Sequence, residues 1–146
     1  MQLQHVRKIE NDGNLIFMPG LFHEVMDIIL ESYEYFEAHD ATDSSRIPPF
    51  LQAIYSNEMS RITMRLTSVM AWLMARKAVS SGQLTMDEAL TDYRLEGDGY
   101  CLHHDHSVSN ILPYYMNDLL MRSHAIYLRV WRLDQQSSGQ VAHLVN

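Results

Sequence analysis

The sequence predicts an all-α protein, an antiparallel three-helix bundle with one short extra helix between the second and third long helices. Three separate segments repeat apolar residues at alternating spacings of three and four, the pattern of helices that pack along one face. The chain also has ten methionines against four prolines and six glycines, which favours helix over strand. The three helices are long enough to lie beside one another, so we expect a bundle.

The first predicted helix follows Pro19 and Gly20. Its apolar residues are spaced four, three, four and three apart, so they line one face. They are Phe22, Met26, Ile29, Tyr33 and Phe36. The opposite face carries four carboxylates, which should lie at the surface because burying unpaired carboxylates is costly. They are Glu24, Asp27, Glu31 and Glu34.

The second predicted helix begins at Pro49, which suits a first turn, and runs to about Ser81, where Gly82 is a natural stop. Its apolar stripe consists of Tyr55, Met59, Ile62, Leu66, Val69 and Leu73. Met70 and Met74 widen this stripe on one side. A helix that is apolar over so wide an arc is either central in its bundle or covered by a second chain.

Another side of the same helix carries Trp72 among arginines, away from the apolar stripe. Trp and Arg are enriched at protein interfaces, and this side is not needed for the apolar stripe. The alternative is structural, with Trp72 packed under a connecting loop and solvated arginines around it. The sequence therefore offers four candidate partner-binding residues: Arg61, Arg65, Trp72 and Arg76.

A short helix is predicted at 85–94, where Thr85 and Glu88 match a capping box. The last helix should start near Asn110 and end near Asp134. Its stripe consists of Leu112, Met116, Leu119, Ile126, Val130 and Leu133, with Ser123 at the one polar position.

These elements predict one domain. The helical bundle is expected at residues 18–134, after an N-terminal arm at 1–17 that is partly flexible. Residues 135–146 show no sustained period, so we expect them to form a flexible C-terminal tail.

The stretch "YCLHHDHSVSN" (100–110) gathers residue types that bind metals. A structural zinc site needs four converging ligands, usually separated by two to four residues. Here the histidines are nearly adjacent, and no second pair of ligands is visible elsewhere. We therefore expect a solvated loop in which Asp105 or Ser107 helps to start the last helix, and no required metal site. The candidate ligands of the alternative are Cys101, His103, His104 and His106.

Composition narrows the function classes. The net charge of -7 argues against a general nucleic-acid binder, which needs a basic face. Cys101 is the only cysteine, which fits a reducing compartment. The start has no apolar signal core, and no run reaches the roughly 18 apolar residues that span a bilayer. We expect a cytoplasmic protein without membrane association.

Enzyme signatures are missing as well. The sequence contains no phosphate-binding glycine loop, no nucleophile elbow and no metalloprotease motif. We therefore expect no catalytic residue and no cofactor. A DNA-binding regulator remains an alternative, because "RKAVSSGQLTMDEALTDYR" (76–94) resembles a helix-turn-helix. Its second helix carries acidic residues, which would repel phosphate.

The segment "NEMSRITMRLTSVMAWLMARKAVSSGQLTMDEAL" (57–90) resembles the signature of the RcdA family, the regulators of CtrA degradation. The residues that match in place are Arg65, Leu66, Thr67, Trp72, Leu73, Ala78, Val79, Gly82 and Thr85. Upstream, "FHEVMDIILESYEYFE" is similar to the first helix of the family. Downstream, "LLMRSHAIYLRVWRLD" is similar to the last, with Ser123, Arg129, Leu133 and Asp134 in place. The resemblance covers about 18–134.

This resemblance implies a homodimeric three-helix bundle without enzymatic activity. It implies an adaptor that helps to deliver regulators, including the cell-cycle transcription factor CtrA, to the ClpXP protease. The implied partners are ClpXP, response regulators and transcription-factor clients. The alternatives from the residues themselves, a DNA-binding regulator or a metal- or small-ligand-binding bundle, remain open at this point.

Overall fold

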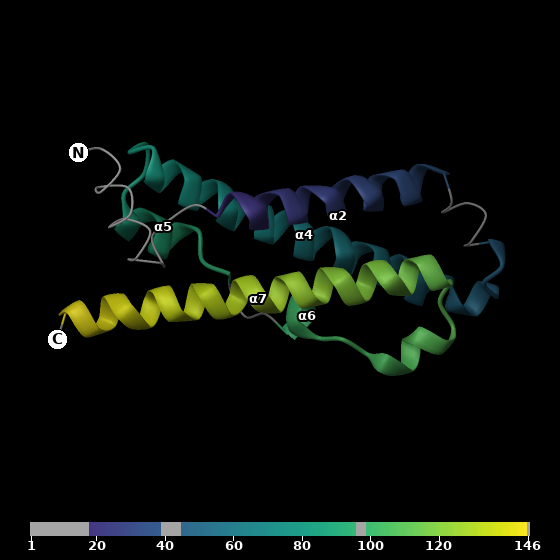
Figure 1. Ribbon diagram of the computed structural model, residues 1–146. Coiled ribbons are helices and arrows are strands. Elements are labelled where there is room, and N and C mark those ends of the chain that lie inside the picture. The colour runs from purple at the N-terminus through teal and green to yellow at the C-terminus, as the bar shows by residue number, and fades with distance from the viewer. Residues whose placement is uncertain (1–17, 39–44, 96–98, 146) are drawn as a thin grey trace.

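The computed structural model contains helices and turns but no strand in the residues that it describes, which are 18–38, 45–95 and 99–145. Three long helices run along the molecule (Figure 1): α2 (Pro19–Ala38), α4 (Gln52–Ser80) and α7 (Tyr114–Val145). The all-helical fold class predicted from the periodicity is confirmed. The predicted N-terminal arm, residues 1–17, lies outside the described residues.

Shorter elements connect the long helices. They are the 3-10 helices η1 (Pro49–Leu51) and η2 (His106–Asn110) and the short α-helices α5 (Met86–Asp92) and α6 (Gly99–Leu102). The extra helix predicted at 85–94 is α5, and its capping box is formed as expected, since the side chain of Thr85 accepts from the Glu88 amide and Glu88 accepts from the Thr85 amide. Helix α6 is too short to show an apolar period and is not predicted from the sequence.

Helix α2 runs antiparallel to α7. Glu31, in the second half of α2, pairs with Arg122 of α7, and Glu24, nearer the start of α2, pairs with Arg129 at 2.8 Å. The later residue of α2 thus pairs with the earlier residue of α7, as expected for helices that run in opposite directions. These two ion pairs also change the predicted role of the acidic face, because two of its four carboxylates bind α7 instead of facing only solvent.

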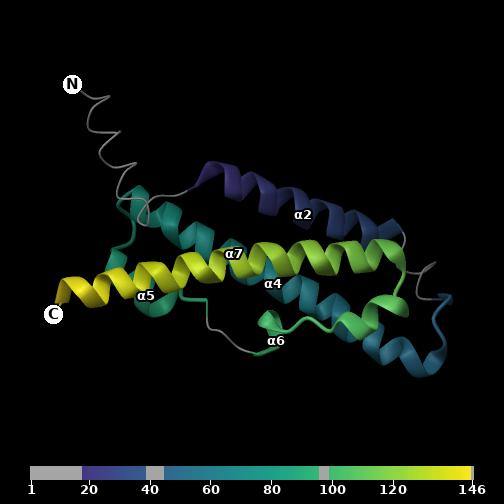
Figure 2. The same ribbon diagram turned by 60° about the horizontal axis from the view of Figure 1, so that its bottom comes forward.

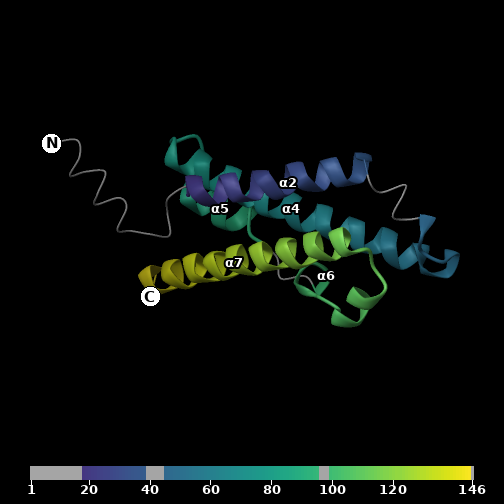
Figure 3. The same ribbon diagram turned by 45° about the vertical axis from the view of Figure 1, so that its right-hand side comes forward.

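Helices α4 and α7 run parallel, so the prediction of a fully antiparallel bundle is wrong on this point. Arg65 contacts Ser123 at 3.2 Å, and Trp72, further along α4, contacts Asp134 further along α7 at 2.9 Å. Two parallel neighbours require a connection that returns the chain to the starting end. Figures 2 and 3 show α5 and α6 in this connection, which we call the crossover.

The buried face of α2 is offset from the predicted one by a single residue. The buried residues are Leu21, Val25, Ile28, Ser32 and Tyr35. Most of the predicted residues are only partly buried, and Tyr33 is exposed. Two neighbouring stripes of α2 share the spacing of three and four. Contacts with α4 and α7 determine which of the two stripes is buried. Apolar periodicity did not favour the buried stripe because it includes the polar residue Ser32.

The core stripes of the other two long helices are confirmed. On α4 the buried residues of the predicted stripe are Tyr55, Ile62, Leu66, Val69 and Leu73. On α7 and the turn before it they are Leu112, Met116, Leu119, Ser123, Ile126 and Val130. Met59 and Leu133 are partly buried against this core. Regular spacing located these faces because each helix packs on neighbours over most of its length.

Helix α7 begins and ends later than predicted. Residues 106–110 form η2, with Asp105 as its N-cap, so α7 begins at Tyr114 instead of near Asn110. It continues to Val145, so residues 135–145 are helical and do not form the predicted tail. Asp134 and Ser137 are buried and extend the stripe through Val130 at spacings of four and three. An apolar pattern cannot reveal a stripe that continues through polar residues. In the described part of the chain, no helix is both long and apolar enough to cross a membrane.

Two glycines give a matched test of these helix ends. Gly82 ends α4 with a φ of +76°, whereas Gly139 lies inside the last turns of α7, and neither would bring a Cβ within 4 Å of another group. We expect Gly82→Ala to lower the free energy of unfolding by about 1 kcal/mol because of backbone strain. Gly139→Ala should raise it by up to about 1 kcal/mol because alanine favours helix. Urea unfolding checks both, and a destabilising Gly139→Ala would contradict the long α7.

Candidate functional site

The four candidate partner-binding residues are not on the surface. Arg61, Arg65, Trp72 and Arg76 are 6%, 0%, 4% and 2% exposed. The expectation that this side of α4 is free to meet a partner is therefore wrong in its premise. The structural alternative correctly expected Trp72 to be packed inside the protein. It was wrong about the arginines, which are buried and not solvated. The crossover and α7 cover this side.

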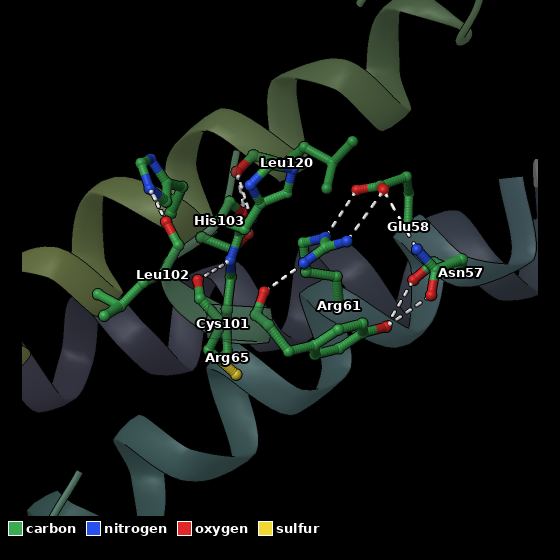
Figure 4. Close-up of polar contacts among 11 residues, drawn as sticks. Asn57, Glu58, Arg61, Arg65, Cys101, Leu102, His103 and Leu120 are labelled. Atoms are coloured by element: carbon green, nitrogen blue, oxygen red, sulfur yellow. Dashed lines mark hydrogen bonds and ion pairs between the residues drawn. The ribbon is translucent and has the colours of Figure 1, made fainter. Parts of the chain in front are cut away.

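Arg65 caps the end of α6. Its guanidinium donates to the carbonyl oxygens of Cys101 at 2.9 Å and His103 at 2.6 Å, both in the crossover (Figure 4). It also donates to α7, to the Leu120 carbonyl at 3.0 Å and the Ser123 hydroxyl at 3.2 Å. The last carbonyls of a helix have no partner within the helix, so a buried helix end needs such donors.

Arg61, one turn before Arg65, acts on the same segment. It pairs with the buried Glu58 at 3.0 Å and donates to the carbonyl oxygen of Tyr100. Its guanidinium lies 4.3 Å from the centre of the Tyr100 ring, a cation–π distance. The Tyr100 hydroxyl in turn donates to the Asn57 carbonyl at 2.9 Å. Figure 4 shows these contacts joining one face of α4 to α6.

His124 of α7 completes the cap, because its Nε2 lies 2.9 Å from the Leu102 carbonyl. Four consecutive carbonyls of the crossover, at residues 100–103, thus contact Arg61, Arg65 or His124. Burial, followed by the charge of Arg61, lowers the pKa of Arg65 to about 10, which leaves it cationic at neutral pH. We call Arg61, Arg65 and His124 the crossover cap.

A second buried cluster surrounds Asp134, which is fully buried on α7. Trp72 donates its indole N–H to Asp134 at 2.9 Å, and Arg76 lies 3.6 Å from the same carboxylate. Arg94, at the end of the α5 segment, approaches it at 3.4 Å. Burial lowers the pKa of Arg76, and the Asp134 charge opposes this effect. Asp134 therefore ties α4 and the first part of the crossover to α7.

The sequence identified the members of two of these contacts but did not predict that they pair. Arg65, Trp72, Ser123 and Asp134 all matched the RcdA resemblance, and the structure brings them together as Arg65 with Ser123 and Trp72 with Asp134. Glu58 was missed, although its spacing of three from Arg61 was a signal for an ion pair on a helix.

Two rings of the histidine stretch, those of His104 and His106, pack in a row next to His124 of α7. The ring of His104 stacks on His124 with centroids 4.9 Å apart, and His106 meets His104 edge-on at 4.7 Å. Cys101 is buried in the core cluster. Among the described residues, no group of three or more His, Cys, Asp or Glu side chains could hold a metal ion. The contribution of this stretch to the fold comes from its backbone carbonyls at residues 100–103, which contact the crossover cap.

The exposed side of α4 differs from its buried side in charge. Between Gln52 and Ala75 all charged residues, Glu58, Arg61 and Arg65, are buried. The exposed residues, which we call the uncharged face, are Ala53, Ser56, Asn57, Ser60, Thr63, Met64, Thr67, Ala71 and Met74. A groove beside this face lies between α4 and α2, and no charged residue lines it.

Removal of the Arg65 guanidinium tests the crossover cap. Arg65→Met removes the donor to the carbonyls of Cys101 and His103 and to the Ser123 hydroxyl, whereas the Leu120 carbonyl still accepts from Ser123. A buried polar group without a partner costs about 1 to 3 kcal/mol. We expect the free energy of unfolding, measured in urea, to fall by at least about 3 kcal/mol. The matched control is Arg129→Met, whose exposed ion pair with Glu24 should contribute at most about 1 kcal/mol. Equal losses in the two variants would contradict the cap.

The stacked histidines predict a pH dependence of stability. Burial, then the charges of His124 and His106, lowers the pKa of His104 from its usual 6.5, and burial also lowers that of His124. The unfolded chain therefore binds more protons at mildly acidic pH, so stability present above pH 6.5 is lost as the pH falls below it. His104→Gln should flatten this loss in thermal melts across the range. His103→Gln, at an exposed position outside the stack, is the control and should leave the slope unchanged.

Comparisons with known proteins agree with this geometry. No curated protein matched the chain. Among solved structures, the chain is similar to RcdA from Caulobacter crescentus CB15, with 26% sequence identity and a TM-score of 0.67 over 83% of this chain and 90% of that one. This likeness confirms the resemblance to RcdA predicted from the sequence. A family described as "Protein of unknown function (DUF1465)" matches residues 14–145. The chain belongs to this RcdA-like DUF1465 family.

Proposed function

We propose that this chain is a non-catalytic adaptor that binds protein partners and delivers regulatory proteins to the ClpXP protease. The observation that carries the proposal is the likeness to RcdA along most of both chains. By the same resemblance we propose that the chain acts as a homodimer in the cytoplasm. Its partners are then ClpXP, response regulators and transcription-factor clients such as CtrA.

The geometry supports a role in binding. Arg61 and Arg65 of α4 are engaged with crossover carbonyls and with Glu58, so these charged groups stabilise the fold and are not free to act on a substrate. The exposed side of the same helix offers small and methionine side chains without charge. Surfaces of this kind suit packing against another protein, because methionine adapts its shape and small residues allow close approach.

In the part of the chain that the structure describes, the geometry does not favour either alternative. In the helix-turn-helix hypothesis α5 would be the recognition helix, yet its first turn carries Asp87 and Glu88 and its last residue is Asp92. Like charge would repel the phosphate backbone there. A gel shift at low salt tests DNA binding, and metal analysis of protein purified without a histidine tag tests the other alternative.

The adaptor proposal predicts a gain in proteolysis. The purified chain, used as bait in an extract of its source cells, should recover subunits of ClpXP and at least one regulatory protein, identified by mass spectrometry. In a reconstituted reaction with ClpXP and ATP, addition of the chain should then speed degradation of that recovered protein. The rate is measured as loss of the full-length band with time.

Two controls make the result specific. A substrate that ClpXP degrades without help should be degraded at the same rate with and without the chain. The Arg129→Met variant, altered only at an exposed ion pair, should act like the wild type. If the chain recovers no ClpXP subunit, or leaves degradation of the recovered protein unchanged, the adaptor role is wrong.

A further inference from the structure

Because α4 and α7 run parallel, both helices begin at the same end of the bundle (Figures 1 and 3). A hollow of about 520 Å³ lies at this end, between the residues that precede η1 and those that precede α7. Ile47 and Leu112, which are buried in the core cluster, form its floor. The exposed residues Ile111, Tyr114 and Tyr115 form its rim. We call it the end hollow, and its size and apolar lining are typical of a ligand-binding site.

Exposed aromatic side chains gather at this end of the bundle. Tyr114 is 86% exposed, and Phe50 of η1 is 79% exposed. Among the large apolar side chains that the structure describes, these two are the most exposed. Exposed apolar patches mark interaction sites, and tyrosine is enriched among the residues that contribute most to binding. The end hollow therefore has the composition of a contact surface.

The walls of the end hollow are held in place by contacts within the bundle. The Tyr115 ring stacks on Tyr35 of α2, with centroids 5.6 Å apart and an angle of 3° between the planes. The Tyr35 hydroxyl lies 3.0 Å from that of Tyr55 on α4. On the other side, Gln52 donates to the Ile47 carbonyl at 2.9 Å. A site that is already ordered loses less conformational entropy on binding.

The charge of the end hollow is positive, although the chain as a whole carries -7. Of the described residues that line the hollow, Arg46 alone is charged. Arg46 is exposed, and it makes no ion pair or hydrogen bond in the described part of the chain. No acidic residue lies in the first turn of η1, α4 or α7. An acidic group of a partner would therefore meet an unpaired cation beside an apolar surface.

We propose that the end hollow binds an unstructured segment of a partner protein, with a bulky apolar side chain in the hollow and a neighbouring Asp or Glu side chain on Arg46. The proposal rests on the adaptor role of the proposed function and assigns a surface to it. Most of the lining is exposed, so a chain can pass across the hollow, which suits an internal segment. A second copy related by a two-fold axis would place its own Arg46 on the same patch, and like charges there are unfavourable.

The test uses random peptides displayed on phage, selected on the wild type and on two variants. We expect the wild type to enrich peptides that carry an acidic residue close to an aromatic or branched apolar residue. Arg46→Glu should instead enrich peptides with Lys or Arg in the acidic place. The matched control is Arg132→Glu, at an exposed arginine of α7 outside the hollow, which should select the wild-type peptides. Both arginines are exposed, so the helical circular dichroism should stay unchanged.

Fluorescence anisotropy then gives the Kd of the peptide that the wild type enriches most, labelled with fluorescein. Arg46→Glu and Tyr114→Ala should each raise this Kd at least about 10-fold, because one loses the charge and the other the apolar contact. If the wild type enriches no peptide, or Arg46→Glu binds the same peptides with the same Kd, the site is wrong. If Tyr114→Ala instead changes the sedimentation of the chain alone, the occupant is a second copy and the proposal is wrong.

The degradation assay separates this proposal from the adaptor role. If the peptides are selected as expected but the chain does not speed degradation by ClpXP, the adaptor role is wrong and the end hollow remains a peptide site. If Arg46→Glu selects the same peptides as the wild type and speeds degradation equally, the adaptor role stands and the end hollow is wrong.

Discussion

The structure depends on satisfying the buried backbone of the crossover. Because α4 and α7 run parallel, the chain must return along the bundle between them, and its polar backbone then lies against two helices. Arg65 meets this requirement with four hydrogen bonds, two to the crossover and two to α7. Arg61 and His124 supply donors to the carbonyls on either side. Without these donors, parallel packing would bury unpaired carbonyls, each at a cost of about 1 to 3 kcal/mol.

This constraint explains the inverted distribution of charge on α4. Surface helices usually carry their charges outward. Here Glu58, Arg61 and Arg65 point inward because the crossover and α7 supply the carbonyls that guanidinium groups can bind. The outward side is then left with serine, threonine, alanine and methionine. Between Gln52 and Ala75 the helix thus has a charged side that is buried against its own chain and an exposed side without charge.

The same contacts give physical meaning to the likeness with RcdA. Arg65 and Trp72 on α4 match the family signature, and their partners Ser123 and Asp134 on α7 match it too. These residues therefore specify how α4, α7 and the crossover pack. They support a shared fold directly, and they support a shared function only through that fold. All four side chains are buried, so they are not available to contact another protein.

The sequence by itself determined the local structure of this protein. Apolar spacing located the core stripes of α4 and α7, the Thr85 capping box located α5, and Gly82 located the end of α4. These signals suffice because each depends on residues within a few turns of one helix. The RcdA-like family was also recognisable from such a local segment, at 57–90.

Tertiary structure alone decided which polar residues are inside. The parallel direction of α7, the length of that helix through Asp134 and Ser137, and the burial of Arg65 all depend on partners far away in the sequence. A buried arginine and a solvated arginine look alike in a sequence, since what separates them is the presence of unpaired carbonyls nearby. Those carbonyls belong to α6 and to His103 directly after it, a segment without an apolar period. Only the position of this segment against α4 shows that Arg65 must face inward.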